Sequence, residues 1–144
     1  MTTTKHKAYD AAAANLLAAG LDSLANNTNS ASSAAVDNDT GLALFMDLEL
    51  VLAAQGSARS ANASVLVFMV QALDGTNYGT ESETSSRLIA SFPLPATTAA
   101  QRVTMPGIRI PPSKFKIFLR NATGQAFAAS GNTLKYRTYS VETA

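Results

Sequence analysis

The chain has 144 residues, of which 47% are hydrophobic and only 15% are charged, and it contains no cysteine. This length suits one ordinary domain, and the lack of cysteine excludes disulfides, thiolate metal sites and a cysteine nucleophile. The charges are unevenly distributed, since residues 1–100 carry four basic and nine acidic side chains, whereas residues 101–144 carry seven basic and one acidic. Such an asymmetry fits a nucleic-acid surface or self-assembly, and a surface poor in charge favours contact with other proteins.

Residues 1–40 differ in composition from the rest, and we expect them to form an N-terminal arm or long loop. Small polar residues dominate positions 24–41 (LANNTNSASSAAVDNDTG) and favour turns. Four leucines between positions 16 and 24 suit one side of a short helix, but Gly20 interrupts the pattern and an extended strand fits as well. We expect neither a signal peptide nor a membrane span, because the required basic and apolar segments are missing.

The segment 42–53 (LALFMDLELVLA) alternates with the period of a β-strand. One face of this predicted strand carries Leu44, Met46, Leu48, Leu50 and Leu52. The other face carries Phe45, Asp47, Glu49 and Val51. One apolar and one polar face are typical of an antiparallel sheet that covers a core on one side.

The next segment, 64–73 (SVLVFMVQAL), is apolar on both faces and predicts a central strand that is covered on both sides, followed by a turn at Asp74-Gly75. Further strands are predicted at 87–94, 101–105, 114–121, 126–130 and 134–140, separated by breaks that contain Pro, Gly or Asn. Seven or eight short strands without a long helix predict an all-β fold, an antiparallel β-sandwich or jelly roll over residues 41–144 with an extended N-terminal arm at 1–40.

Two of these strands carry alternating basic side chains. In the segment 114–121 the predicted inward set is Phe115, Ile117 and Leu119. The predicted outward side chains of the two strands, which we treat as candidate protein-interaction residues, are Lys114, Lys116, Phe118, Arg120, Lys135, Arg137 and Tyr139. If the two strands share a face, these side chains form one basic, partly aromatic patch. Such a patch is compatible with single-stranded nucleic acid, but the near-neutral chain favours a protein partner, so we do not expect nucleic acid as a partner.

The sequence offers little support for catalysis. Its only histidine, His6, lies in the N-terminal region, and no GxSxG or phosphate-binding motif is present. Paired carboxylates occur at 37/39, 47/49 and 81/83, where both members lie on the same side of an extended backbone and are poorly placed to flank a glycosidic bond. The segment DNDTG at 37–41 lacks the distal glutamate of a calcium loop and is interpreted as an Asx turn. We therefore expect no enzyme activity, metal or cofactor.

The succession LFMDLELVLAAQ, SVLVFMVQALDGTNYG and IPPSKFKIFLRNATGQAFAASGNTLKYRTYS resembles the cement or decoration proteins of tailed bacteriophages, over roughly residues 42–140. This resemblance implies a β-sandwich or jelly roll that is synthesised in the host cytoplasm. It also implies a place on the capsid surface of the virion, with the major capsid protein as partner and self-association, most often as a trimer. The basic residues would then contact acidic groups of the shell or of a sister subunit.

Two other functions remain open. One is a carbohydrate- or receptor-binding sandwich of a fibre or tail, in which Tyr78, Phe118, Tyr136 and Tyr139 stack on sugars. The other is a head-tail connector or tail component. Copy number per particle distinguishes a connector from a decoration protein, and glycan binding distinguishes the fibre protein from both.

Overall fold

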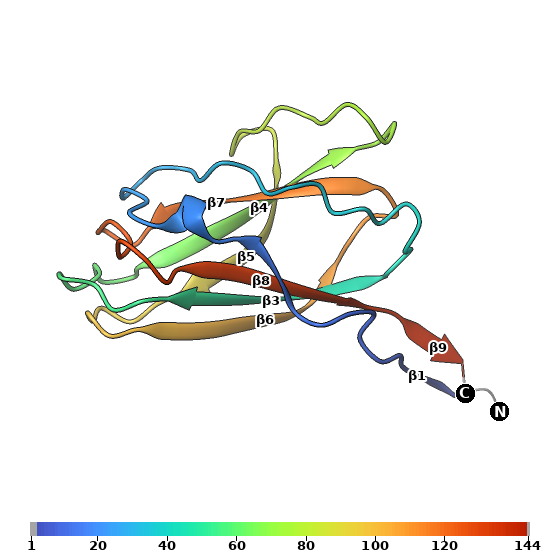
Figure 1. Ribbon diagram of the computed structural model, residues 1–144, viewed down its shortest axis with the longest axis horizontal. Helices are drawn as coiled ribbons and strands as arrows, with labels where there is room; N and C mark the ends of the chain where they lie inside the picture. The colour runs from blue at the N-terminus through green and yellow to red at the C-terminus, as the bar shows by residue number, and fades with distance from the viewer. Residues whose placement is uncertain (1–2, 144) are drawn as a thin grey trace.

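The strands of the chain form two antiparallel sheets and a short ribbon. The computed structural model describes residues 3–143 (Figure 1). The strands are β1 (Thr4–His6), β2 (Ala14–Leu17), β3 (Phe45–Leu52), β4 (Ser64–Ala72), β5 (Arg87–Pro93), β6 (Gln101–Arg109), β7 (Lys114–Ala122), β8 (Thr133–Tyr139) and β9 (Val141–Thr143), with one 3-10 turn, η1 (Ala19–Leu21). The four-stranded sheet has the order β2-β8-β3-β6, and the three-stranded sheet has the order β5-β4-β7. The predicted all-β sandwich is confirmed.

Strand β3 shows why the two sheets pack together. Its inward side chains Met46, Leu48, Leu50 and Leu52 are at most 1% exposed, while Asp47 and Glu49 lie on the outer face, as the alternation predicts. Leu44 was expected on the buried face, and this is wrong: it precedes the strand and is 40% exposed. The buried face of β3 therefore begins at Met46.

Strand β4 is buried on both faces, which confirms the prediction for this segment. Val65, Val67 and Met69 belong to the main core between the sheets. Phe68 and Val70 belong to a second apolar cluster. Because β4 lies in the centre of its sheet, between β5 and β7, an apolar residue is stabilised on either face.

Strand β6 is longer than predicted, because it continues through Pro106 to Arg109. Proline is tolerated here since β6 is the edge of its sheet and pairs only with β3. The register between the two strands shifts between Met46 and Leu48, opposite this proline, and Gly107 has a positive φ of 72°. The edge is thus interrupted by a bulge, which hinders unwanted strand addition.

The strand predicted at 126–130 is wrong, because these residues form a loop. Phe127 is buried in the main core, but its amide donates a hydrogen bond to the carbonyl of Leu24 instead of to a strand. The carbonyl of Ala128 accepts hydrogen bonds from Ser23 N and from Asn132 Nδ2. The apolar pattern of 126–130 therefore reflects a single buried side chain, Phe127, in a loop that backbone hydrogen bonds hold in place.

The N-terminal region lies against the sandwich. The leucine pattern near residue 20 is resolved as a short strand, β2, followed by the single turn η1. Residues 27–36 then run along the free edge of β7, where amides at every third position (Asn27, Ser30, Ser33 and Val36) donate to carbonyls at alternate residues of β7. The hydroxyls of Ser30 and Ser33 accept hydrogen bonds from the amides of Leu119 and Ile117. This segment therefore covers an otherwise open sheet edge.

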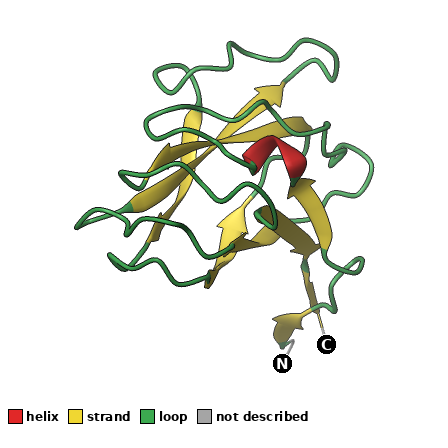
Figure 2. Ribbon diagram, turned by 60° about the vertical axis from the view of Figure 1, so that its left-hand side comes forward, coloured by secondary structure: helices red, strands yellow, loops and turns green. Residues whose placement is uncertain are grey.

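The two ends of the described chain pair with each other. Strand β1 is antiparallel to β9, with Lys5 opposite Glu142, and their ammonium and carboxylate groups lie 3.4 Å apart. Figures 1 and 2 show this ribbon projecting beyond the sheets, with the two ends of the described chain at its tip. Since a two-stranded ribbon has little stability alone in water, it depends on its continuity with β8 and on the aromatic contacts at its base.

Candidate functional site

The seven candidate interaction residues do not form one patch. Strand β7 belongs to the three-stranded sheet and β8 to the four-stranded sheet. Phe115 and Leu134 are both fully buried in the core between the sheets, so the outer faces of their strands point in opposite directions (Figure 1). The structure therefore separates Lys114, Lys116, Phe118 and Arg120 from Lys135, Arg137 and Tyr139.

The cations on the outer face of β7 pair with acids of the same chain. Lys114 Nζ lies 3.9 Å from an Asp39 carboxylate oxygen, and Lys116 Nζ lies 3.5 Å from one of Glu81. Arg120 forms a salt bridge with Glu83. Lys116 Nζ also lies 4.5 Å from the centroid of the Tyr78 ring. The basic side chains of β7 are thus paired with acids in two loops that lie more than 30 residues earlier in the chain.

Phe118 is buried, although it lies on the outer face of its sheet. It stacks on Phe68 with 5.1 Å between ring centroids and 10° between ring planes, and it is 2% exposed. Tyr78 packs against this cluster. Figure 1 shows residues 73–86, which we call the strap, running over β4 and β7. The strap covers the apolar cluster, and its salt bridges to Lys116 and Arg120 hold it in place.

We expect the double variant E81K/E83K to release the strap without unfolding the sandwich. Hydrogen exchange of amides 73–86 should become faster and the fluorescence of an apolar dye should rise, because Phe68 and Phe118 become accessible. The free energy of unfolding should fall by about 1 kcal/mol or less per pair, since the ion pairs are partly exposed. Glu142→Lys, which breaks the pair with Lys5, is the matched control. Unchanged exchange in the strap of the double variant would show that the salt bridges do not hold it.

The cations of β8 lie opposite acids of β3. In the antiparallel register Asp47 faces Arg137 and Glu49 faces Lys135. Arg137 also lies over the ring of Tyr9, with 3.8 Å from its guanidinium carbon to the ring centroid, and its Nε donates to the carbonyl of Ala11 at 3.1 Å. The outer face of this sheet therefore carries alternating charges of both signs.

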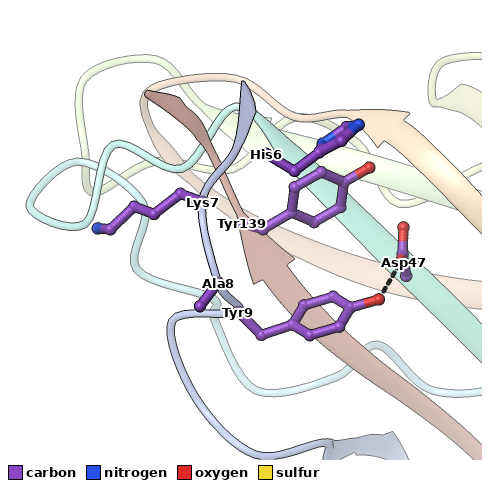
Figure 3. A pocket seen from close by; sticks show the side chains of 6 residues that line it. All are labelled: His6, Lys7, Ala8, Tyr9, Asp47 and Tyr139. Atoms are coloured by element: carbon purple, nitrogen blue, oxygen red, sulfur yellow. Dashed lines mark hydrogen bonds between the residues drawn. The ribbon is translucent and has the colours of Figure 1, made fainter. Parts of the chain in front are cut away.

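An aromatic cluster surrounds Tyr139 at the base of the ribbon. The Tyr139 ring stacks on Phe45 at 5.5 Å and contacts the edge of the Tyr9 ring at 5.6 Å, measured between centroids. His6 lies 5.5 Å away on another side. Figure 3 shows the rings of His6, Tyr139 and Tyr9 side by side, with Asp47 at the hydroxyl end of Tyr9. Three separate segments, β1 with the following residues, β3 and β8, build this cluster.

Asp47 fixes the geometry of this cluster. Its Oδ2 accepts a hydrogen bond of 2.5 Å from the Tyr9 hydroxyl, and its Oδ1 accepts one of 2.7 Å from the amide of Gly107. The hydrogen bond to the carboxylate raises the pKa of Tyr9 above its ordinary value, with burial as a smaller cause. Burial, followed by the charge of Asp47, raises the pKa of Tyr139. Both phenols therefore stay protonated at neutral pH.

A hollow of about 330 Å³ adjoins these groups and is lined by His6, Lys7, Ala8, Tyr9, Asp47 and Tyr139 (Figure 3). A second hollow, of about 220 Å³, shares Tyr9 and Asp47 with the first and extends over Glu49, Thr104 and Lys135. We call the two together the aromatic groove. The alternation of β3 predicted that Phe45 and Asp47 lie on an outer face. No feature of the sequence indicated that Tyr9 and Tyr139 would lie beside them.

The four aromatic residues considered for sugar stacking fall into two pairs on different sheets. Phe118 and Tyr78 lie together on the three-stranded sheet, and Tyr136 is half-buried against the main core. Tyr139 lines the first hollow of the aromatic groove, and Tyr136 lines the second. The groove therefore contains two of the four aromatic residues that the sequence suggested, together with Tyr9, which the sequence did not suggest.

A third surface lies at the end of the sandwich from which the ribbon projects. The loops 37–44, 73–76 and 110–113 meet there, and they carry exposed leucines: Leu42, Leu44 and Leu73, the last of which is 92% exposed. Val141 of the ribbon is also exposed. Leu42 has a positive φ of 49°, a conformation that disfavours a branched side chain. We call these four residues the leucine end.

Acidic turns surround the leucine end. Asp37 Oδ1 accepts hydrogen bonds from the amide of Asp39 and the hydroxyl of Thr40, which makes the segment 37–41 the predicted Asx turn. The carboxylate of Asp74 accepts from the Asn77 side chain and from the amides of Asn77 and Thr76, which together lower the pKa of Asp74 to about 2. The turn at Asp74 therefore keeps its negative charge at all physiological pH values.

Within residues 3–143, no three His, Asp or Glu side chains gather closely enough to hold a metal ion. The same range contains no helix with the length and apolar composition that crossing a membrane requires. Comparisons with protein-family models and with curated protein sequences found no match to this chain.

Proposed function

We propose that the chain is a structural protein of a bacteriophage virion, which binds the outside of the capsid and stabilises it. The observation that carries the proposal is the leucine end: Leu42, Leu44 and Leu73 are exposed in loops at one end of the sandwich, and Val141 is exposed on the ribbon that projects from this end. The resemblance of the segment order to cement and decoration proteins supplies the identity of the partner, the major capsid protein.

The leucine end has the physical properties of an adhesion surface. Burying a leucine side chain contributes about 1.5–3 kcal/mol, so transfer of Leu42, Leu44 and Leu73 into an interface contributes favourably to binding. Leu42 also adopts a left-handed conformation while exposed, and strain of this kind gathers at binding loops. In the isolated chain these leucines stay exposed to water, and a bound partner would bury them.

The rim of this surface determines the charge of the partner. Asp37, Asp39 and Asp74 lie in the loops that carry the leucines, and Lys114 is the cation that pairs with Asp39. An acidic rim favours a shell surface with an apolar centre and a basic edge. The shell contact by the basic residues of β7 and β8 stays a prediction. Because these residues already lie beside acids of the same chain, we favour the leucine end over them as the surface that contacts the shell. Self-association, with a trimer favoured by the resemblance, is part of the proposal.

Capsid binding is tested with particles of the encoding phage from which the chain has been stripped. Purified chain should co-sediment with these particles, and the double variant L42D/L73D should bind at least about tenfold more weakly, because two buried contacts become charged. Leu88→Asp is the matched control, since Leu88 is exposed on the outer face of the three-stranded sheet, away from the leucine end.

Equal binding of the leucine variant and the wild type would reject the leucine end as the contact. Loss of binding in a K116E/R137E variant, with the leucine variant unaffected, would assign the contact to the basic strands. Copy number separates this role from a connector or tail component, since a decoration protein approaches the copy number of the capsid protein. A chain that does not bind stripped particles at all contradicts the proposed function.

A further inference from the structure

The aromatic groove has features that capsid binding does not use. It combines aromatic rings, a carboxylate and several polar atoms along two connected hollows on the outer face of the four-stranded sheet. The first hollow, of about 330 Å³, is within the size range of small-molecule sites. Tyr9 is 43% exposed at the junction of the two hollows, although its hydroxyl is held by Asp47. A ring fixed in place but open to solvent is suited to stacking on a ligand.

The chemistry of the groove disfavours a cationic ligand. The guanidinium of Arg137 already lies over the Tyr9 ring at 3.8 Å, and the Tyr139 ring is stacked on Phe45. The remaining polar groups include acceptors, the carboxylates of Asp47 and Glu49, and donors, the ammonium groups of Lys7 and Lys135. A mixture of donors and acceptors beside a fixed aromatic ring matches a ligand with hydroxyl groups on one side and C–H groups on the other.

The charges of the groove favour an uncharged ligand. Lys7 pairs with Asp10, with 3.7 Å between their charged groups. Across the sheet Lys135 faces Glu49, which also forms a salt bridge with Arg102 at 3.3 Å, and Arg137 faces Asp47. The acids Asp10, Asp47 and Glu49 therefore offset all but one of these four positive charges, which leaves little excess to select an anionic ligand.

The geometry points to a carbohydrate-binding site in the aromatic groove, which takes a short neutral oligosaccharide. One pyranose stacks on the open face of Tyr9, and its hydroxyls exchange hydrogen bonds with Asp47 and with the polar groups of the two hollows. This activity goes beyond capsid binding, because the groove lies on the outer face of a sheet and the capsid contact is placed on the leucines of the end loops. Cement function and sugar binding are therefore separable on one chain.

The test uses the whole chain and three neutral probes: maltotriose, cellotriose and tri-N-acetylchitotriose, titrated by NMR or calorimetry. At least one of them should bind with saturation. Tyr9→Ala and Asp47→Asn should each weaken this binding about tenfold, because the first removes the stacking surface and the second replaces a charged acceptor. Tyr78→Ala, which removes a tyrosine of the strap, should bind the sugar as the wild type does.

Sialyllactose serves as the anionic probe. Preference for sialyllactose over all the neutral probes would overturn the neutral assignment, and no binding of any neutral probe at millimolar concentration would overturn the site. Equal weakening by Tyr78→Ala and Tyr9→Ala would also overturn it, because the loss would not depend on the groove. The L42D/L73D variant should bind sugar as the wild type does. The sugar test therefore remains valid even when the capsid proposal fails.

Discussion

Asn121→Ala should lower the free energy of unfolding by about 3 kcal/mol, one of the two largest effects expected for this chain. Asn121 is fully buried in β7. Its Nδ2 donates to the carbonyls of Leu24 and Gln125, and its Oδ1 accepts from the amide and the hydroxyl of Thr123. The truncation leaves these groups without partners inside the protein, where each costs free energy. Chemical denaturation monitored by circular dichroism measures the change.

The matched control for this prediction is Asn15→Ala, an exposed asparagine on the outer face of β2, which should change stability by less than about 0.5 kcal/mol. Asn121 connects the N-terminal segment to the loop after β7, so its loss should also speed hydrogen exchange in residues 24–28. A loss of stability below about 1 kcal/mol would mean that the buried amide is not the link between these segments.

Gly124→Ala should destabilise the fold by about 2–4 kcal/mol for two reasons that act together. Gly124 has a positive φ of 84°, which a residue with a β-carbon adopts only with strain. A methyl group added there would lie 1.7 Å from Ser60 Oγ and 2.7 Å from Ser60 Cβ. The turn after β7 must therefore move away from the loop that contains Ser60. Thermal or chemical unfolding measures the loss.

A second substitution separates the two causes. In the double variant G124A/S60G the clash with the serine side chain is removed, so a large part of the stability should return, while the conformational cost of about 1 kcal/mol remains. Gly56→Ala is the control, because nothing lies within 4 Å of its added methyl group. No recovery in the double variant would exclude the clash with Ser60 as the cause.

The strands were predictable where side chains alternate over a long stretch. The period of two in 45–52 and the double-sided apolar pattern of 64–72 each report a local environment that the residues themselves encode. The interpretation failed where one buried side chain sits in a loop, as Phe127 does. It also placed Leu44 in the core. The alternation of apolar residues begins before Phe45 in the sequence, whereas the strand itself begins only at Phe45.

The candidate site was less predictable, because it depends on which strands pair. The charge asymmetry between the two parts of the chain suggested a basic surface for a partner. In the fold, β7 meets Glu81 and Glu83, and β8 meets Asp47 and Glu49, so most of that asymmetry is balanced inside the molecule. Strand pairing between segments more than 80 residues apart leaves no local signal, and the aromatic groove arises in the same way.

We propose that this chain is an adhesive sandwich that contacts a shell through the leucine end and pairs its basic strands with acids of the same chain. The decisive measurement is a density map of intact particles of the phage that we propose as its source. We expect the sandwich on the outer surface of the capsid, with Leu42, Leu44 and Leu73 against the shell and the outer faces of β7 and β8 away from it. Particles that lack the chain, or a map in which those outer faces contact the shell while the leucines face solvent, would contradict it.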